Sequence, residues 1–307
     1  MRRMSVCLMV LLLLTGGQTR GQNRGQTPVG DSLKVADLAM RGDAAAIRVA
    51  LARKADVNGT QIDGSTALHW AAERDDVELA DLLIRAGARV VAPTREGVTP
   101  LQLAATNGSA AMIDRLLKAG ADPNAPLTPA GDTALMMAAR TGKTDAIRVL
   151  LEANAGVNAK ETWGGTSPLM WAVSEGHIDA ARRLIEAGAD TNVRSNYVAA
   201  ANGRGFEGRT PLAAAAESKP ADFASGWLTP LMLAAREGDL EMARLLVGAK
   251  ADVNAVAGDG KTALAMAVFN GNYDVASFLV DNKADVNRAD AQRFTPLFWA
   301  VDRRNME

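Results

Sequence analysis

Gly64-Ser65-Thr66-Ala67-Leu68 opens a block that returns along this chain of 307 residues, mostly at intervals of 33 or 34 residues. The later copies are Gly97-Val98-Thr99-Pro100-Leu101, Gly131-Asp132-Thr133-Ala134-Leu135, Gly165-Thr166-Ser167-Pro168-Leu169, Thr229-Pro230-Leu231, Gly260-Lys261-Thr262-Ala263-Leu264 and Thr295-Pro296-Leu297. A fixed period of this length indicates a stack of small units rather than one globular core. A single unit cannot bury its own apolar face, so each is expected to pack against its neighbours. The pattern therefore predicts an extended surface suited to binding.

Within each unit the order of residues predicts two short helices and a turn. Thr99 precedes the apolar run 100–105, where its hydroxyl can accept a hydrogen bond from the first helical turn. A second apolar run ends before Gly120, which can adopt the left-handed conformation that closes a helix. Asp122 and Asn124 follow, and such side chains favour a turn by bonding to nearby backbone.

These features resemble the ankyrin repeat. Thr66-Ala67-Leu68-His69-Trp70-Ala71-Ala72 and Gly188-Ala189-Asp190-Thr191-Asn192 match the two signatures of that family. The resemblance covers residues 31–307, with a weaker first unit over 31–58. It implies an all-α, ankyrin-repeat solenoid of about seven helix-turn-helix units with β-hairpin fingers. It also implies recognition of proteins along the concave side.

Six positions depart from the repeat pattern. Asp75 stands where the glycine between the two helices is expected, and Arg89 and Val91 replace the turn Asp and Asn. Asn154, Lys250 and Lys283 stand where the helix-ending Gly is expected. Asn tolerates the left-handed conformation, whereas each Lys is expected to lose about 1 kcal/mol there.

The first 21 residues predict a secretory signal peptide. Arg2 and Arg3 precede the apolar run 6–14, and small residues follow it. Cleavage after Gly17 or Gly21 fits, with Gly21 favoured, and a retained signal anchor is the structural alternative. Nine apolar residues are fewer than the roughly 20 that span a bilayer. We therefore expect residues 22–30 to be a flexible linker, and the mature chain to be periplasmic or extracellular without stable membrane insertion.

Composition and motifs give no support to an enzyme. The formal net charge is −1, so no strong positive field points to nucleic acid. The two histidines, His69 and His177, lie in different units and have the positions of structural residues. No Cys/His cluster has metal-binding spacing, and no nucleophile or phosphate-binding motif occurs. The sequence predicts no catalytic, cofactor-binding or metal-binding residue.

The spacing of the units breaks between Asn192 and Thr229, where an insert occupies about 193–227. The insert contains a segment, 208–216, that begins like a unit and is stopped by Pro220; we interpret it as a helical stub on an extended finger. A binding loop and a solvated loop without a partner are both consistent with it. The last unit is incomplete at Glu307, which predicts that the sequence is a fragment of a longer chain.

The predicted partner-binding residues lie on the finger tips and at the ends of the first helices. Trp163 and Trp227 lead, because exposed aromatic side chains are favoured binding anchors; the alternative is that each ring folds back on its own hairpin. Phe269 is the one large apolar residue at the helix-end position. Trp70, Trp171 and Trp299 share one position with Leu and Met in other units and are interpreted as packing residues. The remaining candidates are Arg74, Arg95, Glu96, Asn107, Arg140, Glu175 and Arg236.

The favoured hypothesis is a non-enzymatic, exported, monomeric scaffold that binds an unidentified protein partner. A second is the N-terminal targeting module of a larger exported enzyme, and a third is a passive envelope spacer. Downstream sequence with clustered His, Asp or Ser would favour the second. Aromatic substitutions that leave every partner bound would favour the third.

Overall fold

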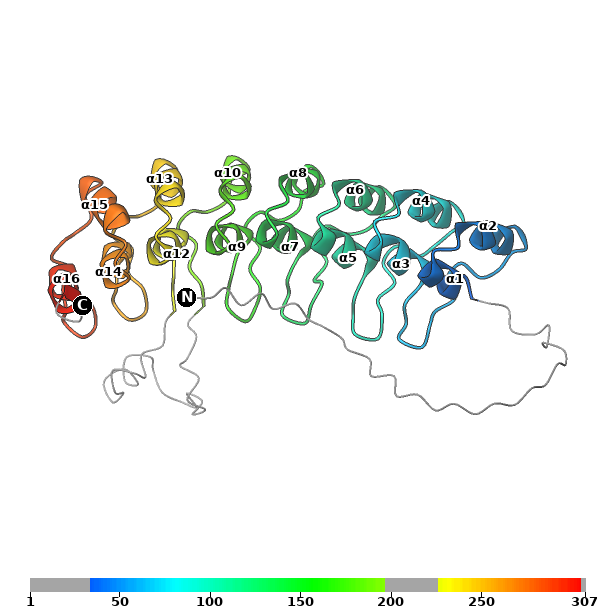
Figure 1. Ribbon diagram of the computed structural model, residues 1–307, viewed down its shortest axis with the longest axis horizontal. Helices are drawn as coiled ribbons and strands as arrows, with labels where there is room; N and C mark the ends of the chain where they lie inside the picture. Colours follow the sequence, from blue (N-terminus) through cyan, green and yellow to red (C-terminus); the bar gives the residue numbers. More distant parts are fainter. Residues whose placement is uncertain (1–33, 197–225, 305–307) are drawn as a thin grey trace. The chain divides into compact units, whose positions relative to one another are not determined.

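The computed structural model describes residues 34–196 and 226–304, which belong to one compact unit. The described residues form seven helix pairs and one further helix, as the repeat period predicts. Figure 1 shows the pairs side by side, with the loops that precede α3, α5, α7, α9 and α14 projecting in one direction. The pairs are α1 (Val35–Arg41) with α2 (Ala44–Ala52), α3 (Ala67–Glu73) with α4 (Val77–Arg85), α5 (Pro100–Asn107) with α6 (Ala110–Lys118), α7 (Ala134–Arg140) with α8 (Thr144–Glu152), α9 (Pro168–Ser174) with α10 (Ile178–Glu186), α12 (Pro230–Glu237) with α13 (Leu240–Gly248), and α14 (Ala263–Phe269) with α15 (Tyr273–Asp281), followed by α16 (Pro296–Arg304). The signal peptide predicted at 1–21, the linker at 22–30 and the helical stub at 208–216 lie outside the described residues.

We call the first helix of each pair helix one; from α3 onward it begins where the repeated Thr or Ser predicts, whereas α1 follows Lys34. Thr99 Oγ1 accepts a hydrogen bond from Gln102 N at 3.2 Å, and Thr262 Oγ1 accepts one from Ala265 N at 3.2 Å. Pro100 occupies the first helical position, where its missing N–H leaves no hydrogen bond unmade. The predicted caps are therefore confirmed.

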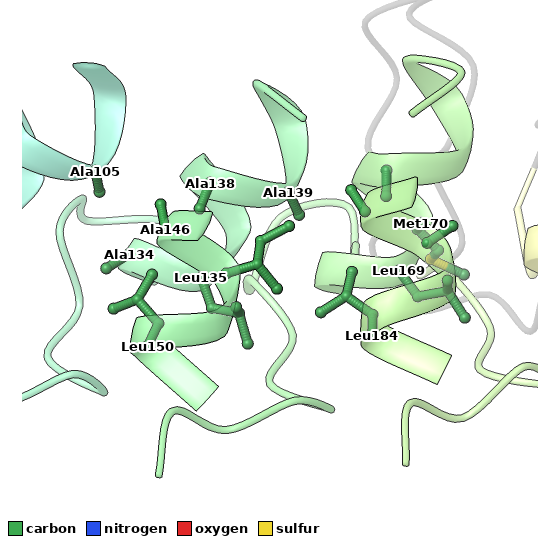
Figure 2. Close-up of a cluster of buried hydrophobic side chains, with 14 of the residues drawn as sticks. Ala105, Ala134, Leu135, Ala138, Ala139, Ala146, Leu150, Leu169, Met170 and Leu184 are labelled. Carbon is green, nitrogen blue, oxygen red and sulfur yellow. The ribbon is translucent and has the colours of Figure 1, made fainter. Parts of the chain in front are cut away.

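Small and large apolar residues divide the packing between them. Ala134, Ala138 and Ala139 are fully buried on α7, where their small side chains let neighbouring helix-one segments approach closely. Leu135 and Leu150 are also fully buried and fill the space within the pair (Figure 2). Truncating such a leucine to alanine typically removes about 2–5 kcal/mol of stability.

Each second helix ends in the left-handed conformation, with or without glycine. Gly120 has φ +99°, as predicted. Asn154, Lys250 and Lys283 take the same conformation with φ 63°, 66° and 70°. Lys54, which the sequence did not single out, joins them at φ 63°. The fold therefore imposes the turn even where the residue does not favour it.

The Asn that ends each unit links it to the next, a role the sequence did not reveal. Asn58 Nδ2 donates to Gly87 O at 3.0 Å, and its Oδ1 accepts from Arg89 N at 2.7 Å. Val91 has no side-chain amide, so it cannot make this link from the second unit to the third. Equivalent links start from Asn124, Asn158, Asn192 and Asn254.

The fingers are turns rather than the expected β-hairpins, because no strand forms in the described ranges. The backbone bonds within a finger are like those from Gln61 N to Ser65 O at 2.9 Å and from Gly64 N to Gln61 O at 3.1 Å. Neighbouring fingers are also joined, as by the bond from Arg95 N to Asp63 O at 2.8 Å. Gly64 permits this approach, since a Cβ there would lie 2.9 Å from Arg95 N.

The insert leaves and returns at the base of one finger. Ser195 N donates to Leu228 O at 2.9 Å. This bond is equivalent to the one from Gln61 N to Ser65 O in the second unit. Leu228 N donates back to Ser195 Oγ at 2.9 Å. Helix α9 packs against α12 across this point, so the stack continues. The described ends of the predicted insert, 193–196 and 226–227, thus belong to the finger.

The repeat pattern predicts that Phe298 and Trp299 of the last unit lack covering neighbours. Phe298 stacks on Phe294 with ring centroids 4.0 Å apart but remains 42% exposed, as predicted. Trp299 is half-buried, packs against the core and makes an edge contact with Phe269 at 5.0 Å, so for this residue the prediction is wrong.

Candidate protein-binding surface

The fingers and the C-terminal ends of the helix-one segments together form what we call the finger surface. Every predicted partner-binding residue is exposed on it. Four lie on fingers: Arg95, Glu96, Trp163 and Trp227. Six lie at helix-one ends: Arg74, Asn107, Arg140, Glu175, Arg236 and Phe269.

Trp163 stands at the tip of its finger and is 88% exposed. This exposed fraction excludes the alternative that its ring folds back on its own hairpin. Glu161, only 6% exposed, organises the loop beneath it. The Glu161 carboxylate accepts hydrogen bonds from the backbone N–H groups of Trp163 at 2.6 Å and Thr166 at 2.7 Å, and from Gly164 at 2.8 Å.

These bonds also set the ionisation of Glu161. Burial by itself raises the pKa of a carboxyl group, but here the hydrogen bonds from Thr166, Gly164 and Trp163 outweigh it. The pKa of Glu161 therefore lies below its ordinary value. The carboxylate stays charged at neutral pH and holds the finger in one conformation.

The three tryptophans on helix one are half-buried, so the prediction of a packing role is only partly correct. Trp70 Nε1 donates to Gln61 Oε1 at 2.9 Å, and Trp299 Nε1 donates to Asp290 Oδ2 at 3.1 Å. Trp171 Nε1 is buried without a hydrogen-bond partner. Arg140 lies over the Trp171 ring, 4.9 Å from its centroid.

Comparison with known proteins matches this architecture. A family model described as "Ankyrin repeats (3 copies)" matches residues 36–127, 124–195 and 231–307. The chain belongs to the ankyrin repeat family. Its ankyrin repeats are similar to the crystal structure of the human ASB11 ankyrin repeat domain, with 24% identity, a TM-score of 0.64, and coverage of 85% of this chain and 99% of that one. They are also similar to the crystal structure of the ankyrin repeat domain of Bcl-3, with 26% identity, a TM-score of 0.62, and coverage of 79% and 96%. No curated protein matches the chain.

Two of the predicted binding residues also hold the ankyrin repeats together. Asn107 Nδ2 donates to Ala72 O at 3.1 Å and to Glu73 O at 3.0 Å in the preceding repeat. Arg74 donates to Met40 O in the same way. These two side chains therefore have a structural role in addition to their exposed position on the finger surface.

Trp227 and Phe269 are both partly exposed, at 42% and 45%. Trp227 has φ 57°, a conformation that is uncommon for a bulky residue and is found where neighbouring structure imposes it. The preceding residue, Gly226, is tied to the next finger by a bond from Gly258 N to Gly226 O at 2.8 Å. Phe269 contacts Trp299 edge to face, which limits its freedom to enter a partner's pocket.

Both histidines have structural contacts. His69 Nδ1 accepts from Thr66 N at 3.1 Å, so Nε2 carries the proton and donates to Val98 O at 3.0 Å in the next repeat. Burial lowers the pKa of His69, which keeps it neutral at neutral pH. His177 Nε2 lies 3.1 Å from Arg140 O of the preceding repeat.

Two features are absent from the described part of the chain. Residues 34–196 and 226–304 contain no group of three or more His, Cys, Asp or Glu residues placed to hold a metal ion. Over the same residues, every helix is too short or too polar to cross a bilayer.

Proposed function

We propose that this chain is a non-enzymatic scaffold that binds a partner protein on its finger surface. Proteins of this family typically serve as interaction scaffolds, and the family match spans only ankyrin repeats. The observation that carries the proposal is Trp163, which is 88% exposed on a loop fixed by the buried Glu161 carboxylate. A large apolar side chain held in water by a rigid support is suited to anchor a partner.

We propose that the rigid finger favours binding. The finger is ordered before any partner arrives, so association loses little conformational entropy. Mixed charges elsewhere on the finger surface supply selectivity. Arg140 and Glu175 lie at neighbouring helix-one ends with Nε and Oε1 4.0 Å apart, and both are about half exposed. Such a loose surface pair contributes little to stability and remains available to a partner.

The proposal is tested by affinity capture with the full chain as bait. A variant carrying Trp163→Ala, Trp227→Ala and Phe269→Ala is compared with a control carrying Arg148→Ala and Arg182→Ala, on the second helices α8 and α10. The expected result is a protein retained by the wild type and the control and lost by the aromatic variant. Equal retention by all three chains would overturn the proposal.

Export completes the proposal and rests on the N-terminal sequence alone. Arg2 and Arg3 followed by the apolar run 6–14 support removal of residues 1–21 and delivery to the periplasm or the exterior. N-terminal sequencing of the protein from its source should begin at Gln22. A chain that retains residue 1 and stays with the membrane fraction would support a signal anchor instead.

A further inference from the structure

A pocket of about 270 Å³ lies between the second and third repeats, where two fingers meet α3 and α5. Trp70 and Leu103 supply apolar wall. Asp63, Glu73 and Glu96 also line it. No Lys or Arg within residues 34–196 and 226–304 lines this pocket, so its lining combines an indole with three carboxyl groups.

The wall of the pocket is fixed before anything enters. The Trp70 ring is half-buried, and its bond to Gln61 Oε1 at 2.9 Å fixes the indole. Asp63 is held by Ser65, whose N and Oγ donate to the carboxylate at 2.9 and 2.8 Å. These bonds lower the pKa of Asp63 and keep it charged.

Glu73 and Glu96 form no salt bridge with any residue in the described ranges. Arg74 donates to Met40 O of the first repeat. Arg95 and Lys34 line an adjoining hollow that Asp63 also lines, so the unpaired acceptors of the pocket are Glu73 and Glu96. His69 is the basic residue among those that line the pocket, and both of its ring nitrogens lie within hydrogen-bonding distance of protein atoms.

The third to seventh repeats lack this concentration of charge. The position of Glu73, the seventh residue of helix one, is Thr106, Arg140, Ser174, Arg236 and Phe269 in those repeats, and Asp302 in α16. Asp259, the equivalent of Asp63 in a later finger, is paired with Lys261 at 2.7 Å. The pocket at the second repeat therefore has a chemistry that the third to seventh repeats do not share.

We propose that this pocket receives an arginine side chain of the partner protein, with the guanidinium group between Trp70 and the carboxylates of Glu73 and Glu96. A guanidinium group is planar, stacks on aromatic rings and donates in several directions, which suits separate acceptors around an indole. A lysine fits the charge but not the planar contact. This inference rests on the proposed function, because it supplies one feature of the partner: an exposed arginine.

The test uses a small probe and does not require the partner. N-acetyl-arginine methylamide is titrated into the ¹⁵N-labelled full chain, and the indole signal of Trp70 is followed after assignment with Trp70→Phe. The expected result is a saturable shift of that signal. The lysine analogue should bind more weakly, and the neutral citrulline analogue should bind about tenfold more weakly or not at all.

Paired variants separate binding from folding. Glu73→Gln with Glu96→Gln should weaken the probe by about tenfold while leaving the thermal midpoint unchanged, because both side chains are exposed. Glu78→Gln with Glu241→Gln, on the second helices, is the matched control and should leave binding unchanged. The absence of a saturable Trp70 shift, or equal shifts with arginine and citrulline, would overturn the inference.

The outcomes also distinguish this inference from the proposed function. If a partner depends on Trp163 but no arginine binds at Trp70, the inference about the pocket is rejected and the proposed function stands. If arginine binds saturably at Trp70 but the aromatic variant captures the same proteins as the wild type, the proposed function of the finger surface is rejected.

Discussion

The second and fifth repeats share a fold but use their fingers differently. In the second, Gln61 lies on the finger and accepts the hydrogen bond of the Trp70 indole. In the fifth, Glu161 closes a finger that is one residue longer, since its N bonds to Thr166 O, five residues on, where Gln61 N bonds to Ser65 O, four residues on. The Glu161 carboxylate bonds to that finger, and Trp171 Nε1 has no hydrogen-bond partner among the residues that the structure describes.

One residue at the base of the finger thus decides what the repeat presents. Gln61 holds the Trp70 indole by a hydrogen bond, and the second repeat offers a pocket beside that fixed ring. Glu161 supports the finger itself, and the fifth repeat offers a projecting Trp163. Ankyrin repeats can therefore vary the binding surface through finger length and one polar side chain while the helices stay the same.

The largest expected effect tests whether the two repeats share one core. Leu83 and Leu184 hold the same position in α4 and α10, and both are fully buried. Leu83→Ala and Leu184→Ala should each lower the free energy of unfolding by about 2–5 kcal/mol. Chemical denaturation measures both. If only one of the two losses falls within this range, the two cores are not equivalent.

A smaller effect is expected from the finger of the fifth repeat. Glu161→Gln removes the charge and one acceptor from three buried or half-buried N–H contacts, so the free energy of unfolding should fall by about 1–3 kcal/mol. The matched control is Glu152→Gln, because Glu152 is exposed and makes only an i,i+4 pair with Arg148. That control should change stability by about 0.5 kcal/mol or less. Equal losses in the two variants would contradict the role assigned to Glu161.

The ionisation of Glu161 gives the same comparison a pH dependence. Its folded pKa lies below the ordinary value of 4.5 because finger N–H groups stabilise the carboxylate. The native state then binds fewer protons than the unfolded state, so the stabilisation is complete above pH 4.5 and is lost as the pH falls through the folded pKa. The stability difference between wild type and Glu161→Gln should therefore shrink on acidification. A difference that stays constant or grows below pH 4.5 would contradict this account.

The smallest expected effect concerns the two indoles. Trp70→Phe removes the bond to Gln61 and leaves its oxygen without that donor, whereas Trp171→Phe removes an N–H that has no partner. Both variants lose similar apolar area, so Trp70→Phe should be more destabilising than Trp171→Phe by about 1 kcal/mol. Thermal unfolding of the two variants side by side checks the order. The reverse order would show that the Trp171 N–H is satisfied in solution.

The sequence predicted the parts of the fold that local chemistry determines. The period, the Thr caps and the helix-ending Gly120 each depend on residues close together in the chain, and the described helices begin and end where those residues indicate. The links made by Asn58 and its equivalents were missed, because their partners lie about one repeat away. The role of Glu161 was also missed, although the adjacent glycines at 164 and 165 indicate an altered finger.

The candidate surface was predictable in position but not in detail. Finger tips and helix-one ends follow from the repeat alignment, and all ten predicted residues are exposed. The additional bonds of Asn107 and Arg74 to preceding repeats depend on how neighbours stack. The pocket at Trp70 brings together residues from two repeats, and only the stacked structure shows that Asp63, Glu73 and Glu96 share one hollow.

The most direct test of the account is site-specific photo-crosslinking within the fifth repeat. A photoreactive phenylalanine replaces Trp163 on the finger or Arg182 on the exposed side of α10, and each chain is irradiated in extract from its source. The account predicts one protein adduct at position 163, competed by unlabelled wild-type chain, and no competed adduct at position 182. An adduct at 182 alone, or equal adducts at both positions, would contradict the claim that the finger surface binds the partner.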